Sequence, residues 1–161
     1  MRVITFVIIT LLAVVGIALA AVLPASAACT GCTVSIGSAS VPFGNYDPFA
    51  TSNLTTTGTI AIVASAPVAA TIPVTVALSA GSGTYAQRHF AGPGMNYALT
   101  TRPGGTTFGD GSTGTLTVNV LALAALVPIT TNVPVYGSIS AGQRSFAAAT
   151  YHDTITVTLT F

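Results

Sequence analysis

The sequence predicts an all-β fold, an antiparallel β-sandwich, from three observations. Short segments that alternate apolar and polar residues recur along the chain, and alternation with a period of two is typical of strands with one buried face. Turn sequences rich in Gly and Pro separate these segments. No segment beyond the N-terminal apolar run has convincing helical periodicity. Many short strands joined by such turns are typical of a sandwich.

The N-terminus has the pattern of a secretory signal peptide. Met1-Arg2 is a short positive start, an apolar run covers residues 3–23, and Ala25-Ser26-Ala27 has the small-x-small form that signal peptidase recognises. We therefore expect residues 1–27 to be a signal peptide and residues 28–161 to form one exported domain without a stable membrane span.

Two other interpretations of this N-terminal segment stay open. Cleavage before Ala21 would leave a short additional stretch ahead of the domain, and an uncleaved run of about 20 apolar residues would be long enough to span a bilayer. Cleavage is favoured because the run ends in Pro24 and small residues and lacks a basic flank.

Export favours a disulfide between Cys29 and Cys32, the two cysteines of the chain. A redox-active pair is less favoured, because a strand pattern rather than a helix follows it. Half of a metal site is less favoured, because such a site needs more Cys or His ligands nearby. We therefore expect a small structural disulfide.

The chain carries few charges. Charged residues make up 4% of it, against about 25% in an average soluble protein. Once residues 1–27 are removed, three Arg balance three Asp. The sequence contains no basic patch that could hold phosphates, which argues against a nucleic-acid partner. Copies of a neutral chain repel one another weakly, so the composition favours a protein that assembles.

Three strands are expected in the first half of the domain. Alternation over residues 32–43 changes frame at Gly37-Ser38, which indicates one strand with a bulge or kink. Residues 51–57 are polar and are expected to form a loop. The next two strands are expected around residues 60–64 and 72–78. Pro73 indicates that the latter lies at a sheet edge or begins there.

The second half contains short strands and one apolar run. The short strands are expected around residues 85–90, 96–100, 116–120 and 133–137. Leu121–Val127 is wholly apolar, so it is either buried on both faces or an exposed contact patch. The last eleven residues alternate and predict a strand over Tyr151–Phe161, with the Thr residues on its other face. A strand that ends the chain leaves open what pairs with its free edge.

No set of residues supports catalysis. His152 and Asp153 are neighbours, but the chain has no Gly-x-Ser-x-Gly elbow to place a nucleophile. Two His residues alone make a weak metal site. Asp47 and Asp110 lie in turn sequences, where Asp commonly caps the backbone. We therefore expect no catalytic residue, metal or cofactor, and a protein that is not an enzyme.

Five segments carry a recognisable pattern: VPFGNYDP (41–48), QRHFAGPGMNYALT (87–100), TTFGDG (106–111), VYGSISAGQ (135–143) and TYHDTITVTLTF (150–161). Together, and in this order, they resemble the spore coat protein U domain family, which includes subunits of archaic chaperone–usher pili. The residues that carry the resemblance are Phe43, Gly44, Tyr46, Asp47, Arg88, Tyr97, Gly109, Asp110, Gly111, Tyr136, Gly137, Gln143, Tyr151 and Asp153.

This resemblance implies an immunoglobulin-like sandwich that lacks its last strand. In the family a periplasmic chaperone supplies that strand first, and the N-terminal extension of another pilus or coat subunit replaces it at an outer-membrane usher. The implied function is a structural subunit that passes through the periplasm to the cell surface. The implied acceptor groove is lined by Tyr151, Ile155, Val157, Leu159 and Phe161.

The chain departs from the family pattern in two ways. Ala64 stands where family members usually have the Cys that pairs with the one near Cys32. Cleavage before Ala28 leaves about four residues ahead of Cys32, fewer than the roughly five of a typical strand. The alternative function is therefore a terminal or tip subunit, adhesin-like, that accepts a strand and donates none.

Overall fold

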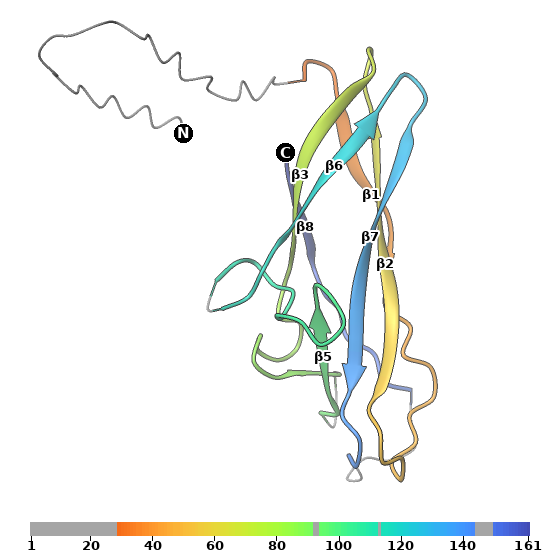
Figure 1. Cartoon of the computed structure of the whole chain (residues 1–161), viewed down its shortest axis with the longest axis vertical. Coiled ribbons are helices and arrows are strands. Elements are labelled where there is room, and N and C mark those ends of the chain that lie inside the picture. Colours follow the sequence, from red (N-terminus) through yellow and green to blue (C-terminus); the bar gives the residue numbers. More distant parts are fainter. Residues whose placement is uncertain (1–28, 92–93, 113, 144–149) are drawn as a thin grey trace, which may run out of the picture.

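Two antiparallel sheets make up the fold (Figure 1). The computed structural model describes residues 29–91, 94–112, 114–143 and 150–161, so the expected signal peptide lies outside the described residues. These ranges contain no helix, and therefore no helix long and apolar enough to cross a membrane. The strands are β1 (Thr33–Ser40), β2 (Leu54–Ser65), β3 (Ala70–Leu78), β4 (Arg88–His89), β5 (Asn96–Thr100), β6 (Val118–Ala124), β7 (Ile129–Ile139) and β8 (Val157–Thr160).

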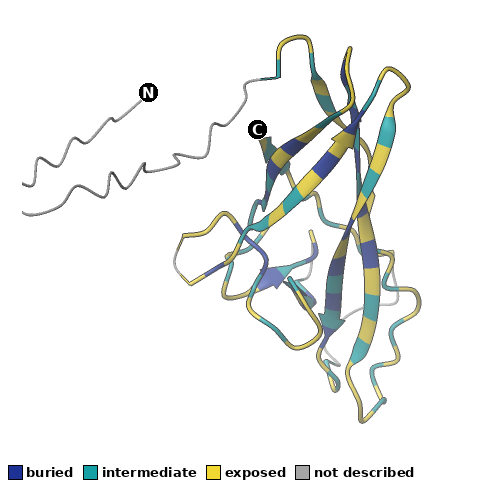
Figure 2. Ribbon diagram, turned by 45° about the horizontal axis from the view of Figure 1, so that its top comes forward, coloured by how far each residue is buried: buried dark blue, intermediate teal, exposed yellow. Residues whose placement is uncertain are grey.

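The strand orders are β1-β2-β7-β5-β4 in one sheet and β6-β3-β8 in the other. All named strand pairs are antiparallel, which confirms the predicted all-β sandwich. Figure 2 shows buried and exposed residues alternating along the long strands. Ile62 of β2, Val76 of β3 and Val133 of β7 point inward and are inaccessible to solvent. Burial of such side chains between the sheets is the main force that holds them together.

The expected bulge in β1 is present. The pairing of β1 with β2 shifts register between Ile36 and Ser38. Gly37 lies at this shift, and a Cβ atom there would come within 2.8 Å of Cγ2 of Val63. Glycine therefore lets the bulged strand lie close to β2, and the frame change in the sequence marks the correct position.

The expected loop over residues 51–57 is wrong for its second half, because β2 begins at Leu54. Leu54 pairs with Ile139 and Thr57 pairs with Tyr136, so these residues extend the ladder between β2 and β7. Thr is β-branched and suits a strand with one exposed face. The polar composition of this segment marks an outward face rather than a loop.

Pro73 does not mark an edge strand, since β3 is the central strand of its sheet. It pairs with Leu121 of β6 on one side. On the other side β8 pairs only with residues 75–78. At Pro73 itself β3 therefore has a single neighbour, which is the condition that a proline in a strand requires.

The apolar run is buried on one face only, and the strand expected around residues 116–120 continues through it as β6. Ala122 and Ala124 are 0% and 2% exposed, whereas Leu121 and Leu123 are 66% and 54% exposed. The run is thus not buried on both faces, and its outward half is an exposed apolar patch.

The final strand is shorter than expected. β8 covers Val157–Thr160, whereas alternation predicts a strand over residues 151–161. Residues 151–156 keep the alternation of half-buried and exposed positions. They make no regular ladder, because β3 ends at Leu78 and turns away at Gly81. The backbone N–H of Ser79 still donates to the carbonyl of Thr156 over 2.9 Å.

Candidate functional site

An open groove lies between the two sheets on one side of the sandwich. β1 is the edge strand of the larger sheet, and β8 is an edge strand of the smaller one. A cavity of about 940 Å³ lies between residues 39–46, which end and follow β1, and residues 150–157, which lead into β8. The two free edges therefore face each other across this cavity.

The floor of the cavity is the hydrophobic core itself. Ile60 of β2, Leu78 of β3 and Val135 of β7 line it, and each is almost fully buried. Protein interiors are normally packed without voids larger than a water molecule. A cavity of this size that reaches the core shows that, among the described residues, no side chains fill the sandwich along this side.

The strands beside the groove bury their inward side chains incompletely. Ile155, Val157 and Leu159 are only half-buried, although they point toward the core. Ile36 of β1 is 40% exposed, whereas Ile62 of the neighbouring β2 is completely buried. The groove thus presents an apolar surface that one further strand would cover.

The five residues predicted to line an acceptor groove are divided by the structure. Tyr151, Ile155 and Val157 line the cavity. Leu159 packs against the core beyond the end of the cavity. Phe161 is 65% exposed. Whether another chain binds these residues stays a prediction.

Four aromatic rings from separate segments form the base of the groove. Phe43 makes edge contacts with Phe90 and Tyr97, each with ring centroids 5.7 Å apart. Phe90 lies 4.6 Å from Tyr97 and 6.2 Å from Tyr151. Such pairs add to the stabilisation from burial alone. Phe90 is not among the residues predicted for the site, although it lies within a segment that carries the family resemblance.

A carboxylate closes this base. Asp153 accepts a hydrogen bond of 2.5 Å from the hydroxyl of Tyr97 and one of 2.7 Å from the hydroxyl of Ser82. Burial alone would raise the pKa of Asp153, but hydrogen bonds from Tyr97, Ser82 and the backbone of Thr154 bring it below its ordinary value. Burial, and then the bond to Asp153, raise the pKa of Tyr97 far above its ordinary value. The pair is therefore a phenol that donates to an ionised carboxylate.

Arg88 lies beneath this base and is 1% exposed. Its Nη2 donates to the carbonyls of Ser79 and Phe108, each over 2.8 Å, and the guanidinium lies over the ring of Tyr85. Burial lowers the pKa of the guanidinium. Its Nε and Nη1 have no hydrogen-bond partner within the described ranges. Arg88 thus holds the end of β3 and the loop at Phe108 together under the groove.

Tyr46 and Gln143 connect the loop after β1 to the end of β7. The hydroxyl of Tyr46 donates to the carbonyl of Ser140 over 2.9 Å and accepts from the backbone N–H of Gln143 over 2.8 Å. The Gln143 side chain bonds both backbone groups of Asn96. Both residues line the cavity, so these bonds hold one of its walls in place.

The remaining residues of the resemblance shape turns and close contacts. Asp47 accepts from the backbone N–H of Phe49, and hydrogen bonds from Ser112 lower the pKa of Asp110. A Cβ atom at Gly137 would come within 2.7 Å of the Phe43 ring. The other positions are Gly44 and Gly111 with positive φ, Gly109 packed against Thr115, and half-buried Tyr136 in β7.

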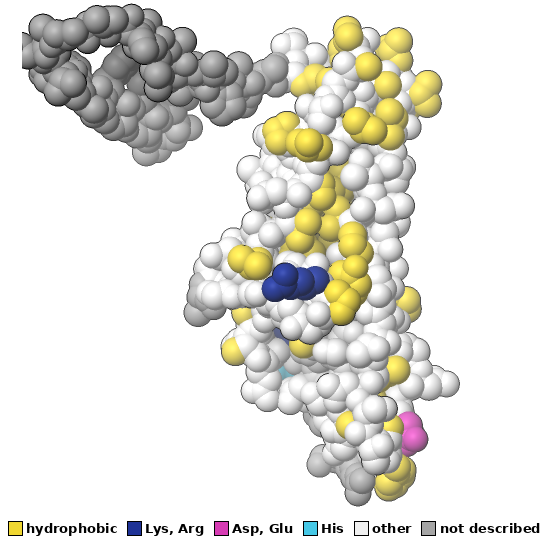
Figure 3. Space-filling view, viewed as in Figure 1, with side chains coloured by type: hydrophobic (Ala, Val, Ile, Leu, Met, Phe, Trp, Pro, Cys, Tyr) yellow, Lys and Arg dark blue, Asp and Glu magenta, His cyan; other side chains and the backbone are white. Residues whose placement is uncertain are grey.

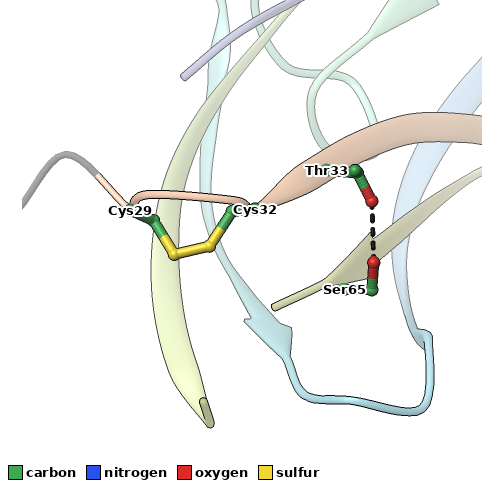
Figure 4. The surroundings of a disulfide bond; sticks show 4 residues. All are labelled: Cys29, Cys32, Thr33 and Ser65. Carbon is green, nitrogen blue, oxygen red and sulfur yellow. Dashed lines mark hydrogen bonds between the residues drawn. A yellow bond between two sulfur atoms is a disulfide. The ribbon is translucent and has the colours of Figure 1, made fainter. Parts of the chain in front are cut away.

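Cys29 and Cys32 are joined in a disulfide just ahead of β1 (Figure 4). Gly31 between them has a φ of +78°, and the next residue, Thr33, bonds the hydroxyl of Ser65 over 2.7 Å. Ala64, where the family pattern has its second Cys, is buried beside this end of β1. The disulfide between Cys29 and Cys32, which are three positions apart in sequence, thus lies at the end of β1 where the family pattern has a disulfide from β1 to β2.

The described part of the chain holds no group of three or more His, Cys, Asp or Glu residues that could bind a metal ion. His152 lies on the cavity wall, and its carbonyl accepts from the backbone N–H of Ala91 over 2.9 Å. Its side chain is exposed, on the face opposite to that of Asp153.

Comparison with known proteins shows a match to one family model. A family model described as the Spore Coat Protein U domain matches residues 18–158. The match covers every strand except the last two residues of β8, and it begins ahead of the expected mature start at Ala28. No curated protein matches the chain.

Proposed function

This chain belongs to the Spore Coat Protein U domain family, which is associated with pilus and coat subunits, and we propose that it is a structural subunit of a secreted surface pilus or coat. Its groove accepts a strand from a periplasmic chaperone and then, at an outer-membrane usher, from another subunit. A signal peptide over residues 1–27 directs it to the periplasm, and assembly carries it to the cell surface.

The groove is the observation that supports this proposal most strongly. Its two sides are the end of β1 and the start of β8, and among the described residues no strand pairs with the outer edge of either strand. An added strand would bond the backbone of these edges, and its alternate side chains would cover Ile36, Ile155 and Val157. An open edge of this kind pairs with whatever strand is available, which is the reason for a chaperone.

The oligomeric state of the exported chain tests the proposal. Without a chaperone or donor peptide we expect the purified chain to aggregate, and with a bound strand we expect a soluble complex. A stable monomer in the absence of any other chain would contradict it. Size-exclusion chromatography with light scattering distinguishes these states.

A terminal or tip subunit is the second candidate function. Leu126 and Val127, in the turn between β6 and β7, are 80% and 75% exposed, and Val68, in the turn between β2 and β3, is 75% exposed. Apolar side chains gather at this end of the molecule (Figure 3). Replacing Leu126 and Val127 by Ser should then abolish adhesion while assembly continues. Unchanged adhesion would count against this candidate.

A further inference from the structure

The second open edge of the smaller sheet is β6. It pairs with β3 on one side, and among the described residues no strand pairs with Val118–Ala124 on the other. Exposed edges normally carry a charge, a proline or a bulge that prevents pairing. The pairing of β6 with β3 is continuous, β6 contains no proline, and no charged residue occurs between Gly111 and Gln143. Nothing in this strand opposes pairing with another chain.

The outward face of this edge is apolar. Leu121 and Leu123 are more than half exposed and lie beside Pro73 and Thr71 of β3. The side chains that alternate with them are small and buried, as Ala122 shows. A strand that paired with β6 would bond its free backbone groups and cover both leucines.

We propose that this edge pairs with the β6 edge of a second copy of the chain. In an antiparallel pair, residues opposite each other lie on the same face of the sheet. A symmetric pairing centred on Ala122 places Leu121 of each copy opposite Leu123 of the other. If the pairing is shifted by two residues in either direction, only one of the two leucines lies opposite a leucine. The edge is therefore complementary to itself, as a two-fold interface requires.

The product is a six-stranded sheet, β8-β3-β6-β6-β3-β8, which is an ordinary sheet size. No charged side chain on β6 repels the second copy. β6 and β8 lie at opposite edges of the same sheet, so this contact leaves the groove free. The contact joins subunits laterally, whatever fills the groove.

Register-specific crosslinking tests the proposal. Two full-length chains that differ in tag, one with Leu121→Cys and one with Leu123→Cys, are expressed together and the exported protein is mildly oxidised. Directly opposed residues lie within reach of a disulfide, whereas diagonal pairs do not. We expect mixed dimers in several-fold excess over the dimers that either variant forms alone, with the unsubstituted chain as the control for its own cysteines. Equal amounts of mixed and single-variant dimers, or none, would overturn the proposal.

A charge introduced at the edge provides the second test. Leu121→Lys should abolish lateral association, measured by analytical ultracentrifugation of the exported protein with a donor peptide bound in its groove. Leu126→Lys introduces the same charge at a residue that is even more exposed but lies outside β6. It should leave association unchanged. If both variants dissociate equally, the patch acts as a general apolar surface and the paired-strand proposal fails.

Discussion

The hydroxyl of Tyr97 donates a hydrogen bond of 2.5 Å to Oδ2 of Asp153, and so joins β5 to the segment that leads into β8. The two elements belong to different sheets of the sandwich. Both residues line the open cavity. The bond therefore fixes the spacing of the two sheets at the base of the groove, where no strand of the described chain lies between them.

Replacing Tyr97 by Phe removes this bond and leaves Asp153 with its bonds to Ser82 and Thr154. We expect the free energy of unfolding to fall by about 1–2 kcal/mol, because a hydrogen bond to a charged acceptor is lost. Denaturant unfolding of the exported protein measures it. Tyr136→Phe is the matched control, since that residue lies in β7 outside this network. An equal loss in both variants would contradict the assignment.

Asp153 should make stability depend on pH. Burial alone would raise its pKa, but the hydrogen bonds from Tyr97 and Ser82 bring the pKa below the ordinary value. A carboxyl whose pKa is lower in the folded state stabilises the fold above its unfolded pKa, which is about 3.9, and loses this effect as the pH falls through the folded value. The difference in Tm between the unsubstituted chain and Asp153→Asn should therefore be constant near neutral pH and shrink below about pH 4. A difference that does not change down to the lowest pH at which both variants fold would exclude this role.

A side chain at Gly81 should disturb the base of the groove. It has a φ of +72°, and a Cβ atom there would collide with the carboxylate of Asp153 and with Cδ1 of Ile155. Gly104 has a φ of +61° with no atom within 4 Å of that position, so Gly104→Ala isolates the backbone cost. We expect Gly104→Ala to cost about 1–2 kcal/mol of unfolding free energy and Gly81→Ala clearly more. Equal costs would show that the contacts across the groove base are unimportant.

Alternation predicted the faces of residues 151–160 correctly because it depends only on local geometry, whereas Phe161, expected on the inward face, is exposed. Ile155 and Val157 are half-buried, and Thr154, Thr156 and Thr158 are exposed, as expected. The start of β2 at Leu54 and the central position of β3 depend on which strands lie beside them. Those neighbours are distant in sequence, and composition contains no signal for them.

The groove base could be predicted only in part, for the same reason. Phe43, Tyr97 and Tyr151 were identified from the family resemblance, but all three rings meet the ring of Phe90 because four separate segments converge. The bonds from Ser82 to Asp153 bridge 71 positions of sequence. No local pattern indicates such contacts, so the sequence identified residues of the site without identifying how they act together.

A charge inside the groove should stop assembly, whereas a charge beside it should not. Val157 of β8 lines the cavity, and Thr158 is the next residue and points outward. Val157→Asp would force a carboxylate beneath the incoming strand without a partner, and a buried unpaired charge is strongly unfavourable. We expect Val157→Asp to be absent from the assembled surface material and Thr158→Asp to be incorporated into it, as seen by immunogold electron microscopy of exported material. Circular dichroism shows whether each variant folds, and a folded Val157→Asp that is still incorporated would contradict an acceptor groove.

The intact mass of the exported chain decides which end of the assembly it can occupy. We expect a chain that starts at Ala28 and gains alkyl groups only after reduction, because Cys29 and Cys32 are bonded to each other. Such a chain has too few residues ahead of β1 to fill the groove of a neighbour, so it accepts a strand without donating one. A start at Ala21 would provide a short donor and favour a repeating subunit, and an uncleaved mass would contradict export. Alkylation without prior reduction would show that the thiols are free and would contradict the disulfide ahead of β1. The cleavage site read from the mass would not be affected.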